Sequence, residues 1–103
     1  MKMKSDFEIV NIEDDYMLVP VGDQIESFRG TVILNEISAF LLEKMKAERT
    51  LEEMISLLTS EYDIDDITAE RDINKLLNGM REIGILDEWI KELIIQLLKI
   101  YHH

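Results

Sequence analysis

The hydrophobic pattern of this chain changes its period once, near Asn35, and that change limits the folds open to it. Before this point, apolar residues alternate with polar ones in short runs at residues 7–12 and 16–20, as they do in half-buried strands. After it, apolar residues recur every three or four positions as far as residue 83, as on the buried faces of helices. The sequence therefore predicts a small sheet followed by a group of helices.

Strand-like segments account for most of the first third of the chain. An acidic turn at residues 13–15 joins the first two strands into a hairpin, because Asp favours turns by bonding to its own backbone, and Pro20 helps to end the second strand. Two further strand-like pieces are expected at residues 25–28 and 31–34, hinged at Gly30. Turn formation explains the acidic residues without a metal ion.

Each of the three helices expected after the sheet has a recognisable cap. The caps are Asn35 for the first helix, a capping box of Thr50 and Glu53 for the second, and Asp66 or Thr68 for the third. Gly84 stands where a left-handed residue would end the third helix, and Ile85 with Leu86 can form one more extended pair. A last helix is expected from about residue 87 to the end.

This order predicts an α+β fold of the winged helix-turn-helix type, with a three-stranded antiparallel sheet, three helices and an extra C-terminal helix. The 103 residues leave room for one domain, which we place at residues 1–86, with a helical extension at 87–103 packed on the domain or on a partner. Apolar residues cover more than one face of the extension, which favours homodimer formation or docking on an enzyme. They are Trp89, Ile90, Leu93, Ile94, Ile95, Leu97, Leu98 and Tyr101.

The chain lacks the residues on which most catalytic sites depend. It has no cysteine, which excludes disulfides, thiolate metal sites and cysteine nucleophiles. Its two histidines, His102 and His103, lie at the extreme end, and the sequence does not separate a native tail from an expression tag. The acidic run at residues 63–66 lacks the ligand spacing of a calcium loop. We therefore expect no enzyme activity, no metal and no cofactor.

Net charge narrows the range of partners. With 22 acidic and 11 basic residues the chain carries a formal charge of −11, which repels nucleic acid and anionic membrane surfaces. The third expected helix, which would read DNA in a winged-helix regulator, balances three basic residues with three acidic ones between residues 68 and 82. The sequence contains neither an export signal nor a membrane span, so we expect a cytoplasmic protein. A transcriptional regulator stays open as the alternative.

A small sheet has edge strands, and residues 31–34 are a candidate edge. Unpaired N–H and C=O groups there could receive an extended peptide as an added strand. Such an edge can equally be protected by twist, a bulge and flanking charge, which would leave a generic protein-interaction subunit.

Short motifs follow one another in an order and spacing that are together fairly specific. They are YMLVP at 16–20, TVILNE at 31–36, TLEE at 50–53, YDID at 62–65, DI at 72–73 followed by LL at 76–77, Met80, and IGIL at 83–86. In this respect the chain resembles the PqqD-like family, named after pyrroloquinoline quinone biosynthesis protein D, over roughly residues 7–86. The extension after residue 86 lies outside the familiar pattern.

The resemblance implies a non-catalytic protein that binds the leader segment of a ribosomally made precursor peptide. It would present the peptide to a maturation enzyme, such as a radical S-adenosylmethionine enzyme or a leader protease. In the family the peptide lies between the third strand and the third helix. Carried over to this chain, the peptide-binding residues are Thr31, Val32, Ile33, Leu34, Asp72, Lys75, Leu76 and Gly79. Of these, Leu34 is expected to be core rather than contact, as are Leu77 and Met80.

The acidic charge of the chain bears on which leader it could bind, because leaders often carry acidic residues themselves. Either the leader is basic or apolar, or the groove is locally less acidic than the whole chain. Arg29, Arg71, Lys75 and Arg81 lie in or near the expected groove, and screening over about 8 Å lets the local field differ from the global one.

Overall fold

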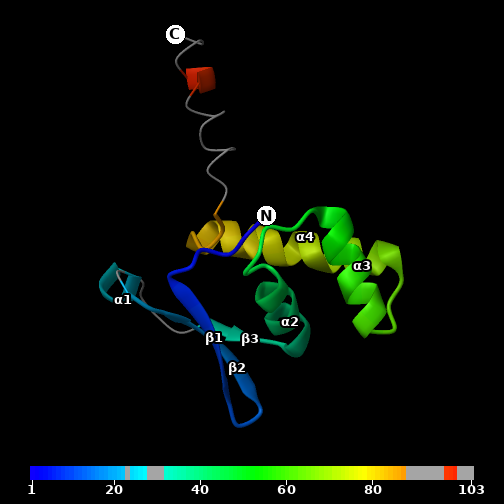
Figure 1. Cartoon of the computed structure of the whole chain (residues 1–103), viewed down its shortest axis with the longest axis horizontal. Helices are drawn as coiled ribbons and strands as arrows, with labels where there is room; N and C mark the ends of the chain where they lie inside the picture. Colours follow the sequence, from blue (N-terminus) through cyan, green and yellow to red (C-terminus); the bar gives the residue numbers. More distant parts are fainter. Residues whose placement is uncertain (23, 28–31, 88–96, 100–103) are drawn as a thin grey trace.

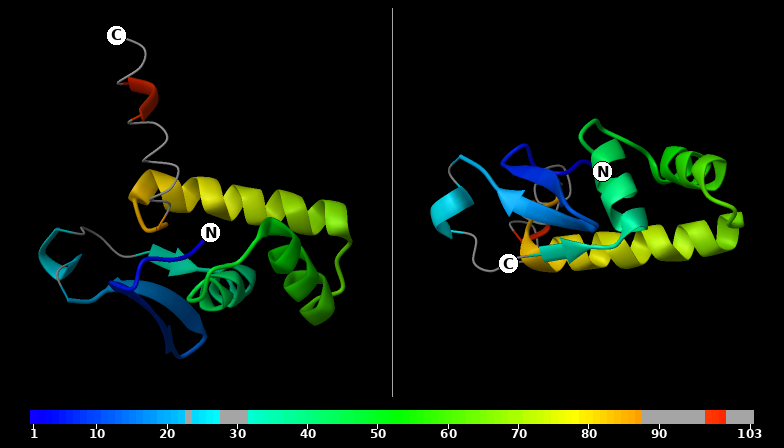
Figure 2. Two further views of the ribbon diagram at one scale, coloured as in Figure 1. Left: turned by 45° about the horizontal axis from the view of Figure 1, so that its top comes forward. Right: turned by 90° about the horizontal axis from the view of Figure 1, so that it is seen from below.

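The computed structural model describes residues 1–22, 24–27, 32–87 and 97–99, and it confirms the α+β fold (Figure 1). Its elements are β1 (Phe7–Ile12), β2 (Asp15–Pro20), α1 (Gln24–Ser27), β3 (Val32–Leu34), α2 (Glu36–Lys44), α3 (Leu51–Glu61) and α4 (Asp66–Ile83). The three strands form one antiparallel sheet in the order β1-β2-β3, so β3 is an edge strand. The helices after β3 pack beside the sheet, with α2 between the sheet and α3 (Figure 2).

The strand expected at residues 25–28 is wrong, because the segment begins as the single helical turn α1. Gly22 has a φ of +58°. The N–H groups of Gln24 and Ile25 then donate to the carbonyls of Val21 and Gly22, both at 3.3 Å. The Ile25 side chain is 61% exposed, so no burial favours an extended conformation. A run this short cannot be assigned from periodicity alone. Residue 28, the hinge at Gly30 and Thr31 lie outside the described residues.

Helix caps follow the sequence prediction with one correction. The Asn35 side chain accepts the Ser38 N–H at 2.7 Å, and Thr50 and Glu53 form the full capping box with two bonds of 3.1 Å. The cap of α4 is Asp65, not Asp66 or Thr68. Its Oδ1 accepts the Thr68 N–H at 2.7 Å. Several residues of this acidic linker could cap the helix. The cap is the last residue with extended backbone before the helix begins, and that residue is Asp65. Gly84 ends α4 with a φ of +75°, as predicted.

We expect part of the acid sensitivity of this fold to come from Asp65. The backbone N–H of Thr68 holds the pKa of the Asp65 carboxyl below its ordinary value. A carboxyl whose pKa is lower in the folded state stabilises the fold above its unfolded pKa of about 3.9, and this contribution is lost as the pH falls through the folded pKa. Asp65→Asn keeps an acceptor at the cap but does not titrate. Urea denaturation between pH 7 and pH 2 should therefore show a shallower loss of stability in Asp65→Asn than in the wild type, with similar values at pH 7. Equal pH profiles would contradict this role.

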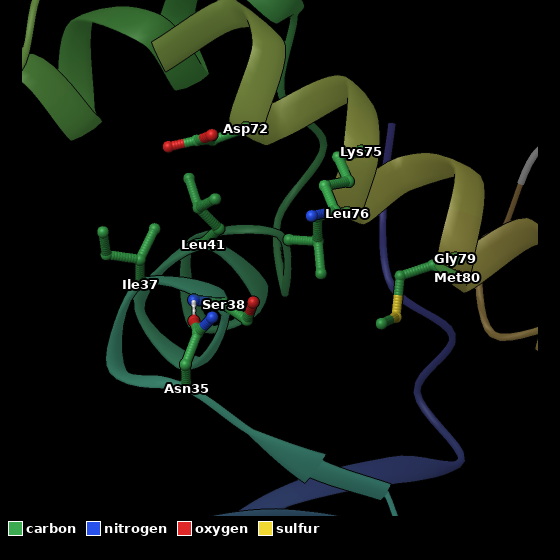
Figure 3. A pocket seen from close by; sticks show the side chains of 9 residues that line it. All are labelled: Asn35, Ile37, Ser38, Leu41, Asp72, Lys75, Leu76, Gly79 and Met80. Atoms are coloured by element: carbon green, nitrogen blue, oxygen red, sulfur yellow. Dashed lines mark hydrogen bonds between the residues drawn. The ribbon is translucent and has the colours of Figure 1, made fainter. Parts of the chain in front are cut away.

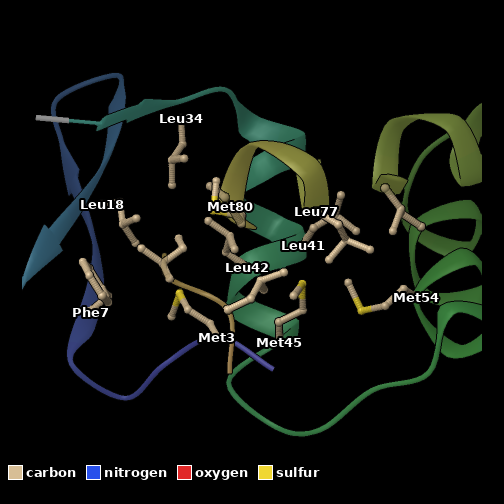
Figure 4. Packing of buried hydrophobic residues seen from close by; sticks show 14 of the residues in the cluster. Met3, Phe7, Leu18, Leu34, Leu41, Leu42, Met45, Met54, Leu77 and Met80 are labelled. Carbon is tan, nitrogen blue, oxygen red and sulfur yellow. The ribbon is translucent and has the colours of Figure 1, made fainter. Parts of the chain in front are cut away.

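A single apolar core fills the space between the inner face of the sheet and the helices (Figure 4). The strands contribute Phe7, Leu18 and Leu34, and the helices contribute Ala39, Leu41, Leu42, Met54, Leu58, Ala69, Ile73, Leu77 and Met80. The core includes Leu34, Leu77 and Met80, which were expected there.

Residues 1–6 add a contribution that the sequence did not predict. Met3 is 2% exposed and forms an antiparallel bridge with Leu86. Its N–H donates to the carbonyl of Met45, and the N–H of Lys4 donates to the carbonyl of Ile85, both at 2.8 Å. The expected extended pair at Ile85 and Leu86 is therefore present, and its partner is the beginning of the chain. These bonds hold the segment after α4 against the end of α2.

The extension expected at residues 87–103 falls largely outside the described residues. Within it, residues 97–99 are helical, and Leu97 and Leu98 are 45% and 51% exposed. Its packing and the homodimer stay predictions. Of the helices that the structure describes, none has the length and apolar character needed to cross a membrane.

Candidate functional site

The outer edge of β3 can be read from the register of the sheet. In an antiparallel pair, residues alternate between pointing both backbone groups at the partner strand and pointing both away. The Val21 N–H donates to the Asp6 carbonyl at 2.7 Å, which continues the β1–β2 register and fixes the phase of this alternation. The backbone N–H and C=O groups of Met17 and Val19 therefore point toward β1. Pro20, which has no N–H, pairs with Phe7 at a position where no bond to β1 is required.

The same alternation assigns the backbone groups of β3. The backbone N–H and C=O groups of Tyr16 and Leu18 point away from β1 and toward β3. In β3 the residues opposite them are Leu34 and Val32, respectively. Val32 and Leu34 thus direct their N–H and C=O groups into the sheet. Ile33 directs its N–H and C=O outward, to the edge at which no strand of the described residues pairs, and the residue is 70% exposed. Ile33 is the residue of β3 whose N–H can donate, and whose C=O can accept, a hydrogen bond with an added strand.

A pocket of about 330 Å³ opens beside this edge, between α2 and α4 (Figure 3). It is lined by Asn35, Ile37, Ser38, Leu41, Asp72, Lys75, Leu76, Gly79 and Met80. Asn35, which caps α2 and lines the pocket, directly follows β3, so the end of the strand lies at the pocket. We call this hollow together with the edge of β3 the groove.

The groove wall on α4 results from the apolar period of that helix. Ile73, Leu77 and Met80 are buried in the core. Positions three or four apart share one helix face, so Asp72, Leu76 and Gly79 form a neighbouring stripe at the margin of the buried face. All three are half-buried in the structure. A Cβ built on Gly79 would meet no described atom within 4 Å, so this glycine leaves open space in the groove wall.

The groove carries one carboxylate and one ammonium group. Asp72 Oδ1 lies 3.8 Å from Nε of the exposed Arg71, which offsets part of its charge. Lys75 is exposed and forms no ion pair within the described part of the chain. The groove is therefore less acidic than the chain as a whole, which is the second of the two alternatives stated for the leader. Among the described residues, no group of three potential ligands is placed to hold a metal ion.

The structure brings together most of the predicted binding residues. Asp72, Lys75, Leu76 and Gly79 line the pocket. Val32, Ile33 and Leu34 form the adjacent strand, where Leu34 is buried in the core, and Thr31 lies outside the described residues.

Four groove residues on the α2 side were not predicted as contacts, namely Asn35, Ile37, Ser38 and Leu41. Asn35 and Ser38 are bonded to each other as cap and third helical residue, and the spacing of Ile37 and Leu41 places both on one helix face. This spacing could have identified them, but in the sequence it is the same signal that marks the core.

Comparisons with known proteins agree with this architecture. The family model described as coenzyme PQQ synthesis protein D (PqqD) matches residues 11–86. A solved structure entitled "TbiB1 in Complex with the TbiA(beta) Leader Peptide" has a similar fold, with a TM-score of 0.68 and 19% sequence identity. The similarity covers 85% of this chain and 96% of that chain. No protein with a curated description matches the chain.

Proposed function

The chain belongs to the PqqD family, and from this premise we propose that it binds the leader segment of a ribosomally synthesised precursor peptide in the groove. The observation that carries the proposal is the free edge of β3, which ends at the pocket between α2 and α4. The solved structure of TbiB1, which has a similar fold, is a complex with a leader peptide, and this supports the ligand class. The protein would act without catalysis, by presenting the peptide to a maturation enzyme.

Strand addition supplies the main-chain part of the binding. A leader running beside β3 would accept the Ile33 N–H and donate to the Ile33 C=O. These bonds depend little on leader sequence, because they join backbone groups. Side chains of the leader that point toward the pocket would then meet Ile37, Leu76 and Met80, and these contacts would supply the selectivity.

The site is tested by titrating candidate leader peptides into the ¹⁵N-labelled protein. We expect the largest amide shifts at Ile33, Ile37, Leu76 and Gly79, which border the groove from three elements. Shifts confined to other surfaces would contradict the assignment. Duplex DNA serves as the negative probe, since a chain of charge −11 releases few counterions on contact with phosphates and should not bind it at physiological salt.

Presentation of the precursor peptide to the maturation enzyme is tested separately from leader binding. Precursor modification by the maturation enzyme should be much faster with this protein than without it. The acceleration should disappear when the leader segment is deleted from the precursor. An enzyme that modifies the precursor equally well alone would contradict a presenting role while leaving leader binding intact.

We expect Lys75 to set the charge preference of the groove. Lys75→Glu replaces an unpaired ammonium group by a carboxylate and removes no core packing. The affinity for an acidic leader should fall about two- to tenfold, as expected for the loss of a surface ion pair plus new repulsion, and binding of an apolar leader should hardly change. Calorimetric titration of both leaders measures this difference. Lys99→Glu is the matched control, because Lys99 is exposed and is not among the residues that line the groove. Equal losses of affinity in the two variants would show that Lys75 does not contact the leader.

A further inference from the structure

A second hollow, of about 270 Å³, lies on the other face of α2 from the groove. Three aromatic side chains form its walls: Tyr16 from β2, Phe40 from α2 and Tyr62 from the end of α3. We call it the aromatic pocket. No residue lines both hollows, so a ligand in one does not occupy the other. The groove lies between α2 and α4, whereas the aromatic pocket lies between α2, the sheet and the end of α3.

One ring of the aromatic pocket already has a positive charge beside it. Phe40 and Tyr62 meet edge to face, with centroids 5.5 Å apart and an interplanar angle of 87°. The ammonium nitrogen of Lys44 lies 5.4 Å from the centroid of the Phe40 ring. Cations favour the negative faces of aromatic rings at this distance. Lys44, a residue of the same helix, thus already places a cation on a ring face that suits one.

Carboxylates at the rim add to this preference. Glu36 and Glu43 both border the aromatic pocket, and Glu43 is paired with Lys46 at 3.1 Å. Glu36 is exposed and forms no ion pair with any residue that the structure describes. An adjoining hollow shares Tyr16 and Glu36 and is also bordered by the three carboxylates of the β1–β2 turn, at residues 13–15.

The carboxylates around the aromatic pocket also affect the pKa of Tyr62. Burial raises the pKa of the Tyr62 hydroxyl above its ordinary value, and the nearby Glu36 and Glu61 carboxylates raise it further. The aromatic pocket and its surroundings therefore combine apolar ring faces with negative potential. An arginine side chain matches both features, because its flat guanidinium stacks on rings and pairs with carboxylates.

We propose that the aromatic pocket receives a basic side chain, arginine above all, from a protein partner while the groove on the other face of α2 holds the leader. The guanidinium would lie against the Phe40 and Tyr16 rings and pair with Glu36, displacing Lys44 from the Phe40 ring. Only the identity of this partner as the maturation enzyme rests on the proposed function. The pocket's preference for a cation stands on its own.

The preference is tested with small probes of defined charge. N-acetylarginine amide is titrated into the ¹⁵N-labelled full chain, with N-acetylnorleucine amide and N-acetylglutamate amide as uncharged and acidic counterparts. The arginine probe should shift the amides of Tyr16, Phe40 and Tyr62 and bind more tightly than either counterpart. If the acidic or the neutral probe binds these residues as well as arginine does, or if arginine shifts none of them, the proposal is wrong.

Two substitutions with opposite expected signs sharpen the test. Glu36→Gln should weaken arginine binding about two- to fivefold, the size of a surface ion pair, whereas Glu52→Gln on the exposed side of α3 should leave it unchanged. Lys44→Gln removes the competing cation and should strengthen arginine binding about two- to fivefold. Weaker binding in Lys44→Gln, or equal binding in Glu36→Gln and Glu52→Gln, would overturn the proposal. Leader titrations of the same variants should match the wild type, so a failure here is distinct from a failure of leader binding.

Discussion

Ile33→Pro should weaken leader binding about 5- to 150-fold while the protein stays folded. Proline removes the outward N–H of the edge strand, and a lost hydrogen bond to a buried acceptor costs about 1–3 kcal/mol. The fold tolerates the change because this N–H makes no bond inside the sheet and the Ile33 side chain is 70% exposed. Calorimetric titration with the leader measures the loss, and thermal denaturation checks the fold.

Two neighbouring variants separate the backbone from the side chain. Ile33→Ala keeps the N–H and should retain most of the affinity. Val32→Pro removes an N–H that points into the sheet toward Leu18, so it should lower the stability of the fold by about 1–3 kcal/mol. If Ile33→Pro binds the leader as the wild type does and remains folded, strand addition at β3 is wrong, and the leader binds elsewhere.

Leu42→Ala should lower the free energy of unfolding by about 2–5 kcal/mol, a large part of the stability of a domain of this size. Leu42 is 0% exposed and lies on the buried face of α2, beside Leu41 and Met45 (Figure 4). Truncation leaves a cavity that the surrounding helices and strands can fill only in part. Urea denaturation at neutral pH measures the change.

Ile67→Ala is the matched control for this prediction. Ile67 is a residue of similar size in the first turn of α4, but it is 82% exposed. Its truncation should change stability by no more than about 0.5 kcal/mol. Similar losses in Leu42→Ala and Ile67→Ala would mean that the core is not where the structure places it.

The groove and the core meet in the same helix, which limits how α2 can be varied. Its buried residues include Ala39, Leu41 and Leu42, and its partly exposed residues border the groove on one face and the aromatic pocket on the other. Substitutions at Ser38 should therefore alter the groove with little effect on the core, whereas Ile37 borders the groove and also packs against the core. Substitutions at Leu41 would alter both, since Leu41 is 1% exposed and still borders the groove.

Local sequence determined the elements whose signals are local. The caps at Asn35 and Thr50 and the glycine stop at Gly84 are contacts between residues a few positions apart, and the structure has all three. The β1–β2 hairpin was also predicted, although its turn is Glu13 and Asp14 alone, because Asp15 already pairs with Ile12 as the first residue of β2. The order of these elements, with the motifs along residues 16–86, was enough to indicate the family.

Where local signals compete or are weak, the sequence was insufficient. The linker before α4 contains several possible caps, and Asp65 rather than Asp66 or Thr68 serves. The α1 turn replaces an expected strand, since four residues carry too little periodicity to distinguish the two. The bridge between Met3 and Leu86 joins residues at opposite ends of the domain, and no local pattern announces such a contact.

The sequence by itself determined most of the strands and helices, where most of them end and which residues are apolar enough to be buried, because those properties depend on neighbours along the chain. Tertiary structure alone decided that Ile33 rather than Val32 points its N–H outward and that α2 has a pocket on each face. The reason is physical. The direction of a backbone N–H is set by the register of the neighbouring strand, and a pocket exists only where side chains from separate elements leave a space between them.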